Sequence, residues 1–218
     1  MAHLAVRLLG TFQVTLAEAP VTAFESDKVR ALLAYLLVEA QPHRPAALIG
    51  LLWPDMPEAS ARHNLSQVLF NLRQLLGDRT AQPPFLIANR DAIQFNPASD
   101  ASLDVTTFQR LLAACDAQPH EQIERCPSCL QQLQQAVDLY RGDFLHQFFL
   151  NDSAAFEEWS VLQREHLHRR ALTALTHLAA ANEASGNYPR AIQNCERQLA
   201  LDPWREEAHC QLMRVLAR

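Results

Sequence analysis

The chain has 218 residues and a formal net charge of −5; 49% of its residues are hydrophobic and 20% are charged. This length allows one large domain or two small ones, and the composition is ordinary for a globular protein. Only 5 glycines are present, which argues against Gly-rich phosphate-binding loops and favours helices. Acidic and basic residues are mixed in both halves, so any nucleic-acid binding must depend on a local patch and not on bulk charge.

The N-terminal sequence MAHLAVRLLGTFQV has a short apolar run that Arg7 interrupts. It therefore lacks the pattern of a secretory signal or a membrane-spanning segment. We expect a cytoplasmic protein with no membrane association. Its five cysteines are then expected to be reduced.

Residues 4–24 alternate between apolar and polar positions, which predicts short strands. Gly10 and residues 18–20 supply turns between them. The simplest interpretation is a three-stranded antiparallel sheet. The apolar positions are Leu4, Val6, Leu8, Phe12, Val14, Leu16, Val21 and Phe24.

Three helices are predicted next, at residues 27–39, 45–53 and 58–76. Ser26 or Asp27 can cap the first, Pro45 suits the first turn of the second, and Gly77 can end the third. Two short runs, 85–88 and 92–95, then predict a β-hairpin that turns at residues 89–91. A sheet, three helices and a hairpin, in that order, are typical of a winged helix-turn-helix.

Residues 96–103 are polar, and we place a domain boundary there, between domains at 1–98 and 102–218. The second domain is predicted to be all helical, with a long helix at 155–185. Its stretch 172–203 matches the tetratricopeptide pattern, with Gly186, Ala191 and Pro203 at characteristic positions, and a further repeat would begin at Glu206. Since the chain ends part-way through that repeat, we expect a truncated repeat domain. The expected fold class is mainly α with a small β part.

Several segments resemble the SARP-type (antibiotic regulatory protein) transcriptional regulators. The matching segments of the first domain are RLLGTFQV (7–14), KVRALLAYLL (28–37), LIGLLWPDMPEASARHNL (48–65) and LRQLLG (72–77). The second domain resembles the bacterial transcriptional activator domain in DVTTFQRLL (104–112), AVDLYRGDFL (136–145), FEEW (156–159) and LDPWREEAHCQLM (201–213). The order and spacing of these segments are more specific than any one of them.

The resemblance implies a regulator with an OmpR-like winged helix. Such proteins bind double-stranded DNA in the major groove, usually as homodimers on direct repeats, and recruit bacterial RNA polymerase. The tetratricopeptide-like domain supports dimerisation and regulation. Many larger relatives continue with an ATPase and further repeats, which fits a truncated or short-form chain.

On this interpretation helix 58–76 enters the major groove, where the amides of Gln67 and Asn71 are suited to adenine. The other positions predicted to contact DNA lie on the outer face of that helix, on the other helices and at the hairpin tip: Lys28, Arg30, Arg44, Arg62, His63, Ser66, Arg73 and Arg90. A solvated polar helix face is the alternative for each of them.

Two further hypotheses stay open. The chain can instead be a protein–protein interaction adaptor that uses its repeat domain. Alternatively, Cys126 and Cys129 can act as a thiol pair or as half of a zinc site completed by Cys115 or His120, although small packing residues at a helix start are more common. No nucleotide-binding, zinc-protease or hydrolase motif is present. We therefore expect no enzymatic activity, no cofactor and no metal.

Overall fold

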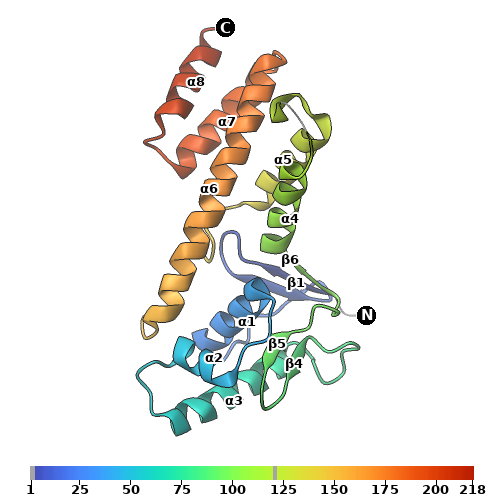
Figure 1. Cartoon of the computed structure of the whole chain (residues 1–218), viewed down its shortest axis with the longest axis vertical. Coiled ribbons are helices and arrows are strands. Elements are labelled where there is room, and N and C mark those ends of the chain that lie inside the picture. The colour runs from blue at the N-terminus through green and yellow to red at the C-terminus, as the bar shows by residue number, and fades with distance from the viewer. Residues whose placement is uncertain (1–2, 120–121) are drawn as a thin grey trace. The chain divides into compact units, whose positions relative to one another are not determined.

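The structure is a computed structural model that describes residues 3–119 and 122–218. Its elements form two compact units (Figure 1). The first unit comprises residues 1–105 and 145–162, and the second comprises residues 106–144 and 163–218. The predicted fold class is confirmed: a small β part and three helices precede an all-helical region. Within the described part of the chain, no helix is long and apolar enough to cross a membrane.

The sheet of the first unit has four strands in the order β3-β2-β1-β6. The strands are β1 (Leu4–Arg7), β2 (Gln13–Leu16), β3 (Ala19–Pro20) and β6 (Ala101–Leu103). Leu4 and Val6 point into the core, as the alternating pattern predicted. The expected third antiparallel strand is present but shorter than predicted: it covers Ala19 and Pro20, the N–H of Val21 still donates to the carbonyl of Val14 at 2.9 Å, and Phe24 lies outside it.

The fourth strand, β6, was not predicted, and it pairs parallel to β1. It lies in the polar segment 96–103 that sequence analysis treated as a linker. The first unit continues into α4 (Asp104–Asp116), where both carboxylate oxygens of Asp104 accept backbone N–H groups. Leu8 donates to Oδ1 at 2.8 Å and Leu9 donates to Oδ2 at 3.0 Å. The end of the predicted linker is therefore a buried anchor of the first unit.

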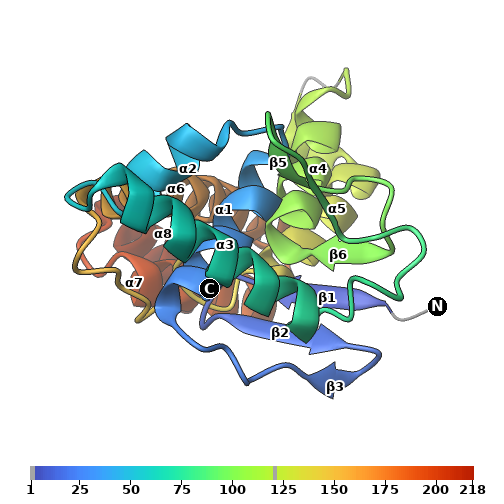
Figure 2. The ribbon, with the colours of Figure 1, turned by 90° about the horizontal axis from the view of Figure 1, so that it is seen from below.

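The helices of the first unit begin and end within one residue of their predicted bounds. They are α1 (Asp27–Glu39), α2 (Pro45–Leu52) and α3 (Glu58–Leu75), and the hairpin strands are β4 (Leu86–Ala88) and β5 (Ile93–Phe95). Leu32, Leu36 and Leu72 are fully buried where α1, α2 and α3 pack together, and each such side chain contributes about 1.5–3 kcal/mol. In Figure 2, α3 is the helix of this unit nearest the viewer.

Residues 145–162 return to the first unit from the second. The N–H of Leu145 donates to the carbonyl of Leu8 at 2.9 Å, and Trp159 donates its indole N–H to the carboxylate of Glu39 at 2.7 Å. The first unit is therefore discontinuous in the sequence, whereas sequence analysis divided the chain once, near residues 98–102.

The second unit is helical throughout. It contains most of α4, the 3-10 turn η1 (Ile123–Arg125), α5 (Pro127–Leu139), the rest of α6 (Ala154–Ala184), α7 (Tyr188–Leu201) and α8 (Glu206–Leu216). Gly186 adopts a positive φ of 76° in the turn between α6 and α7, and Ala191 of α7 is completely buried. Both features fit the tetratricopeptide pattern, in which a small residue lets two helices pack closely.

Candidate nucleic-acid interface

The helix α3 has one buried face and one exposed face. Ala61, Leu65, Val68 and Leu72 are buried, at the i, i+3 and i+4 spacing of a helix. The exposed positions repeat with the same period, and they are Arg62, His63, Ser66, Gln67, Phe70 and Gln74. A helix of 18 residues is about 27 Å long. Its outer face is therefore long enough to follow several base pairs in a major groove.

A groove separates this outer face from the hairpin. Its volume is about 810 Å³. Ser66, Phe70, Arg73 and Gln74 of α3 form one side, Leu86 of β4 forms another, and Asp78, Arg79 and Pro84 lie in the loop between α3 and β4. This is the space between the candidate recognition helix and the wing of a winged helix.

The loop between α3 and the hairpin is held by Asp78, which is buried. Its Oδ1 accepts the N–H groups of Phe85 at 2.5 Å and Leu86 at 3.0 Å. Arg73 of α3 lies 3.7 Å from the second oxygen of this carboxylate. Asp78 therefore fixes the start of β4 relative to the end of α3.

The tip of the hairpin presents Arg90 to solvent. The Oδ1 atom of Asn89 accepts the N–H groups of Asp91 and Ala92, at 2.9 and 2.8 Å, which holds the turn. Arg44, just before α2, is also exposed. Neither arginine has a side-chain partner among the residues that the structure describes, so both are available to phosphate.

Arg62 is exposed on the first half of α3 and pairs with Glu58 one turn earlier, at 2.6 Å. The side chains of Arg62 and Glu58 are 59% and 72% exposed. Such a solvent-exposed i,i+4 pair contributes only about 0.3–0.5 kcal/mol. A phosphate group can therefore compete with Glu58 for this guanidinium at little cost.

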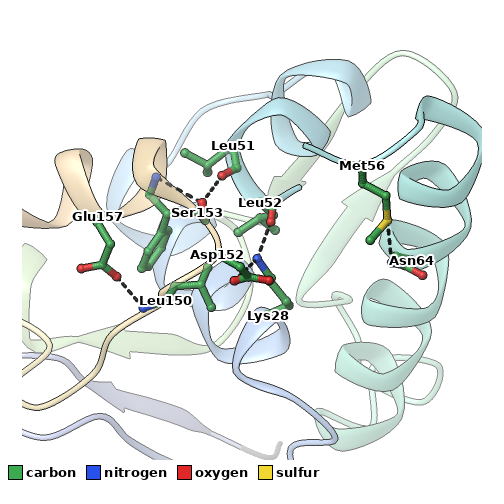
Figure 3. Close-up of polar contacts among 10 residues, drawn as sticks. Lys28, Leu51, Leu52, Met56, Asn64, Leu150, Asp152, Ser153 and Glu157 are labelled. Carbon is green, nitrogen blue, oxygen red and sulfur yellow. Dashed lines mark hydrogen bonds and ion pairs between the residues drawn. The ribbon is translucent and has the colours of Figure 1, made fainter. Parts of the chain in front are cut away.

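Lys28 and Arg30 of α1 are occupied inside the first unit. The ammonium of Lys28 donates to the carbonyl of Leu52 at the end of α2 and lies 2.7 Å from Asp152 (Figure 3). The side chain of Lys28 is 12% exposed. Arg30 pairs with Asp27 at 2.9 Å. In this geometry Lys28 stabilises the packing of α1 and α2, and Arg30 is only partly available.

Replacing Lys28 with methionine is expected to lower the free energy of unfolding by about 1–2 kcal/mol, because the helix-end carbonyl of Leu52 loses its charged donor. The salt dependence of DNA binding should be unchanged. Arg90→Ala is the matched contrast: it should leave stability unchanged and reduce the salt slope by about one. Urea unfolding and titration of DNA at several salt concentrations distinguish the two. A reduced salt slope for Lys28→Met would contradict the structural role.

Asn71 differs from the other predicted positions of α3. Sequence analysis placed it on the outer face, but the structure buries it to 3% exposure, and its Oδ1 atom has no hydrogen-bond partner among the described residues. It lies beside Leu72 and one turn from Val68, at the edge of the apolar stripe. An amide in this position does not present its donor and acceptor to a base edge.

Two residues of the groove were missed. Phe70 is 52% exposed, and the guanidinium of Arg79 lies 5.8 Å from the centre of its ring. The helical spacing from Ser66 and Gln67 also predicts Phe70 on the outer face, but Phe70 was not among the predicted DNA contacts. Arg79 follows the end of α3, in a loop whose path depends on the buried contacts of Asp78, so no periodic pattern indicates it.

The predicted DNA-contacting residues thus fall into two groups. Arg44, Arg62, His63, Ser66, Gln67 and Arg90 are exposed, and Arg73 is half-buried beside the groove. Lys28 and Asn71 are buried or occupied by internal contacts, and Arg30 is partly exposed but pairs with Asp27.

A zinc site at the C-x-x-C motif gains no support from the geometry. Over residues 3–119 and 122–218, no group of three or more His, Cys, Asp or Glu side chains is arranged to hold a metal ion. His120, one of the suggested ligands, lies outside the described residues.

Comparison with known proteins supplies the family. The model of the bacterial transcriptional activator domain matches residues 103–218. A solved structure of EmbR from Mycobacterium tuberculosis, in complex with a low-affinity phosphopeptide, is similar over 99% of this chain, with 27% sequence identity and a TM-score of 0.74. The chain covers 55% of that EmbR chain. No curated protein matches. The chain therefore belongs to the bacterial transcriptional activator domain family, and its predicted resemblance to the SARP-type proteins is confirmed.

Proposed function

We propose that the first unit binds double-stranded DNA with sequence specificity and that the chain acts as a transcriptional activator. The helix α3 enters the major groove, and the hairpin tip carries Arg90 toward the adjacent backbone or minor groove. No enzymatic activity, cofactor or metal is needed for this role.

One observation carries the proposal: the outer face of α3 is exposed, and along its second half it borders a groove that Leu86 of the hairpin also lines. Gln67 is exposed and has no side-chain partner among the residues described, so its amide is free to donate and accept at an adenine edge. Phe70 offers an apolar surface of the kind that contacts the methyl group of thymine. Base edges are therefore read by an amide and an aromatic ring.

Phosphate binding is assigned to the exposed arginines around this face. Arg62 lies near the start of α3, Arg44 lies just before α2, Arg79 lies in the loop after α3 and Arg90 lies at the hairpin tip. About four phosphate contacts per protomer follow, which supports only moderate non-specific affinity. This agrees with a net charge of −5, since a locally basic surface can act where the whole chain is acidic.

The direct test is fluorescence anisotropy with labelled duplexes between about 50 and 200 mM salt. The binding constant is expected to fall with salt with a logarithmic slope of about −4 per bound protomer. Duplexes selected from a random library should bind at least about 1,000-fold more tightly than unrelated DNA. Equal binding to selected and unrelated duplexes would contradict sequence-specific recognition.

The second unit is proposed to support dimerisation on DNA and contact with bacterial RNA polymerase. Large apolar side chains are exposed around α8: Trp204 is 90% exposed, Met213 63% and Leu216 64%. Exposed apolar groups of this kind are typical of protein–protein contacts. Sedimentation of the chain with and without an operator containing two half-sites tests the dimer, and Trp204→Ala is expected to weaken it.

The adaptor hypothesis has one observation in its favour. A groove of about 430 Å³ in the second unit is bordered by apolar, amide and charged side chains, including Leu130, Gln131, Asn182, Glu124 and Arg190. Such side chains can hydrogen-bond the backbone of an extended peptide. Absence of any saturable DNA binding at micromolar protein would favour this function over the first.

A further inference from the structure

Three cysteines of the second unit lie together where α4 is followed by α5. Cys115 is in the last turn of α4, Cys126 is the residue that caps the start of α5, and Cys129 is in the first turn of α5. None of the three forms a disulfide. Cys115 and Cys129 are completely buried, whereas Cys126 is partly exposed. The proposed DNA-binding function uses none of them.

The side chain of Gln118 brings two of these thiols together. Its Oε1 atom accepts hydrogen bonds from Cys126 Sγ at 3.4 Å, from Cys129 Sγ at 3.2 Å and from Ser128 Oγ at 3.0 Å. The Cys129 thiol also lies 4.0 Å from the backbone carbonyl of Cys115, and Cys126 Sγ lies 3.2 Å from Ser128 Oγ. Both sulfur atoms of the C-x-x-C motif therefore lie within hydrogen-bonding distance of the same oxygen atom.

The two cysteines of the motif differ in reactivity. Burial above all, together with the neighbouring thiols of Cys115 and Cys126, raises the pKa of Cys129 to about 12. Cys129 therefore keeps its proton at neutral pH and is shielded from solvent. Cys126 is accessible, and it lies at the N-terminus of a helix of 13 residues, where backbone N–H groups stabilise a thiolate. An oxidant reaches Cys126 first.

We propose that Cys126 and Cys129 are a peroxide-responsive thiol pair that closes to a reversible disulfide at the start of α5. Residues three apart in a helix have Cβ atoms about 5–6 Å apart, and a disulfide requires about 3.5–4.5 Å. The non-helical backbone of Cys126, with φ −96° and ψ 105°, is at the end of the helix, where a small rotation can close this difference.

The reaction balances with one molecule of hydrogen peroxide. The sulfur of Cys126 attacks an oxygen of the peroxide, the O–O bond breaks, and the released hydroxide takes the thiol proton and leaves as water. The sulfur of Cys129 then attacks the sulfenic acid on Cys126, the S–O bond breaks, and hydroxide leaves with the Cys129 proton as a second water. Two thiols are oxidised to one disulfide, and the peroxide is reduced to two waters.

The disulfide removes two of the three donors that Gln118 accepts. Only the Ser128 hydroxyl then joins the end of α4 to the start of α5 through this side chain. Oxidation is therefore expected to loosen the last turn of α4. Faster amide hydrogen exchange at residues 113–117 in the oxidised protein would report this change.

The test is differential alkylation and peptide mass spectrometry of the full chain before and after a stoichiometric amount of hydrogen peroxide. We expect the loss of two free thiols, a disulfide peptide that joins Cys126 to Cys129, and full recovery with dithiothreitol. Cys126→Ser should abolish the bond, and serine is itself a favourable residue at a helix start, so this variant should fold. Cys210→Ser, at an exposed cysteine outside the cluster, is the matched control and should leave the bond unchanged.

Three results would overturn the proposal. In the first, a disulfide joins Cys115 to Cys129 in place of Cys126. In the second, Cys126 proceeds to sulfinic acid in the unmodified chain while Cys129 stays reduced. In the third, the purified reduced protein carries one zinc ion per chain that protects these thiols from alkylation. None of the three depends on DNA binding, so the result is separate from that of the proposed function.

Discussion

Replacing Asp104 with alanine is expected to lower the free energy of unfolding of the first unit by about 3 kcal/mol or more. The carboxylate is buried, and it accepts N–H groups from Leu8, Leu9 and Val105 at 2.8 to 3.0 Å. Hydrogen bonds to a charged group contribute about 1.5–3 kcal/mol each, and a buried donor left without a partner costs its full desolvation energy. Urea unfolding followed by circular dichroism measures the change.

Two variants separate the hydrogen bonds from a general effect of substitution. Asp104→Asn keeps one acceptor oxygen and should lose less stability than the alanine variant. Asp100→Ala removes a carboxylate four residues away that is 48% exposed and pairs with His3, and it should change stability by no more than about 0.5 kcal/mol. An Asp104→Ala protein as stable as the Asp100→Ala protein would show that these bonds do not hold the sheet to the start of α4.

The helices of the first unit could be predicted to within a residue because their apolar positions repeat with a clear period. This period places Leu32, Leu36 and Leu72 on the buried face without any knowledge of the elements that pack against them. Helix boundaries are indicated by Pro45 and Gly77 through their own backbone preferences. The strand β6 could not be predicted in this way. Its residues, Ala101–Leu103, have little intrinsic preference for a strand and become one only by pairing with β1.

The residues of the candidate site differ in the same way: helical spacing fixes the position of some, and tertiary packing decides the exposure of others. Gln67 was placed correctly on the exposed side because it lies well away from the apolar stripe of α3. Asn71 lies at the edge of that stripe, where a rotation of a few degrees and the packing of neighbouring elements decide between exposure and burial. Lys28 was predicted to contact DNA because the sequence does not reveal its partner. Asp152 is more than 120 residues away along the chain, and only the tertiary fold brings it next to Lys28.

Gln67→Ala is expected to weaken binding of the best selected duplex by about 1–3 kcal/mol, which corresponds to a dissociation constant roughly 5 to 150 times higher. Binding to unrelated DNA should be unchanged, because the amide contributes to base reading and not to phosphate contacts. Gln41→Ala, in the exposed link between α1 and α2, is the matched control and should bind the selected duplex normally. Anisotropy titrations at one fixed salt concentration give both constants.

Phe70 allows a sharper experiment, because the group that it is proposed to contact can be removed from the DNA alone. Replacing each thymidine of the selected duplex in turn with deoxyuridine deletes only the 5-methyl group. For the unmodified protein, deoxyuridine at one or two positions should weaken binding. For Phe70→Ala, deoxyuridine at those same positions should cause no further loss of affinity, since an apolar contact exists only when both partners are present. If every uridine-substituted duplex bound both proteins as the parent duplex does, Phe70 would not face a thymine. If instead Gln67→Ala weakened selected and unrelated DNA equally, α3 would contact the backbone and not the bases.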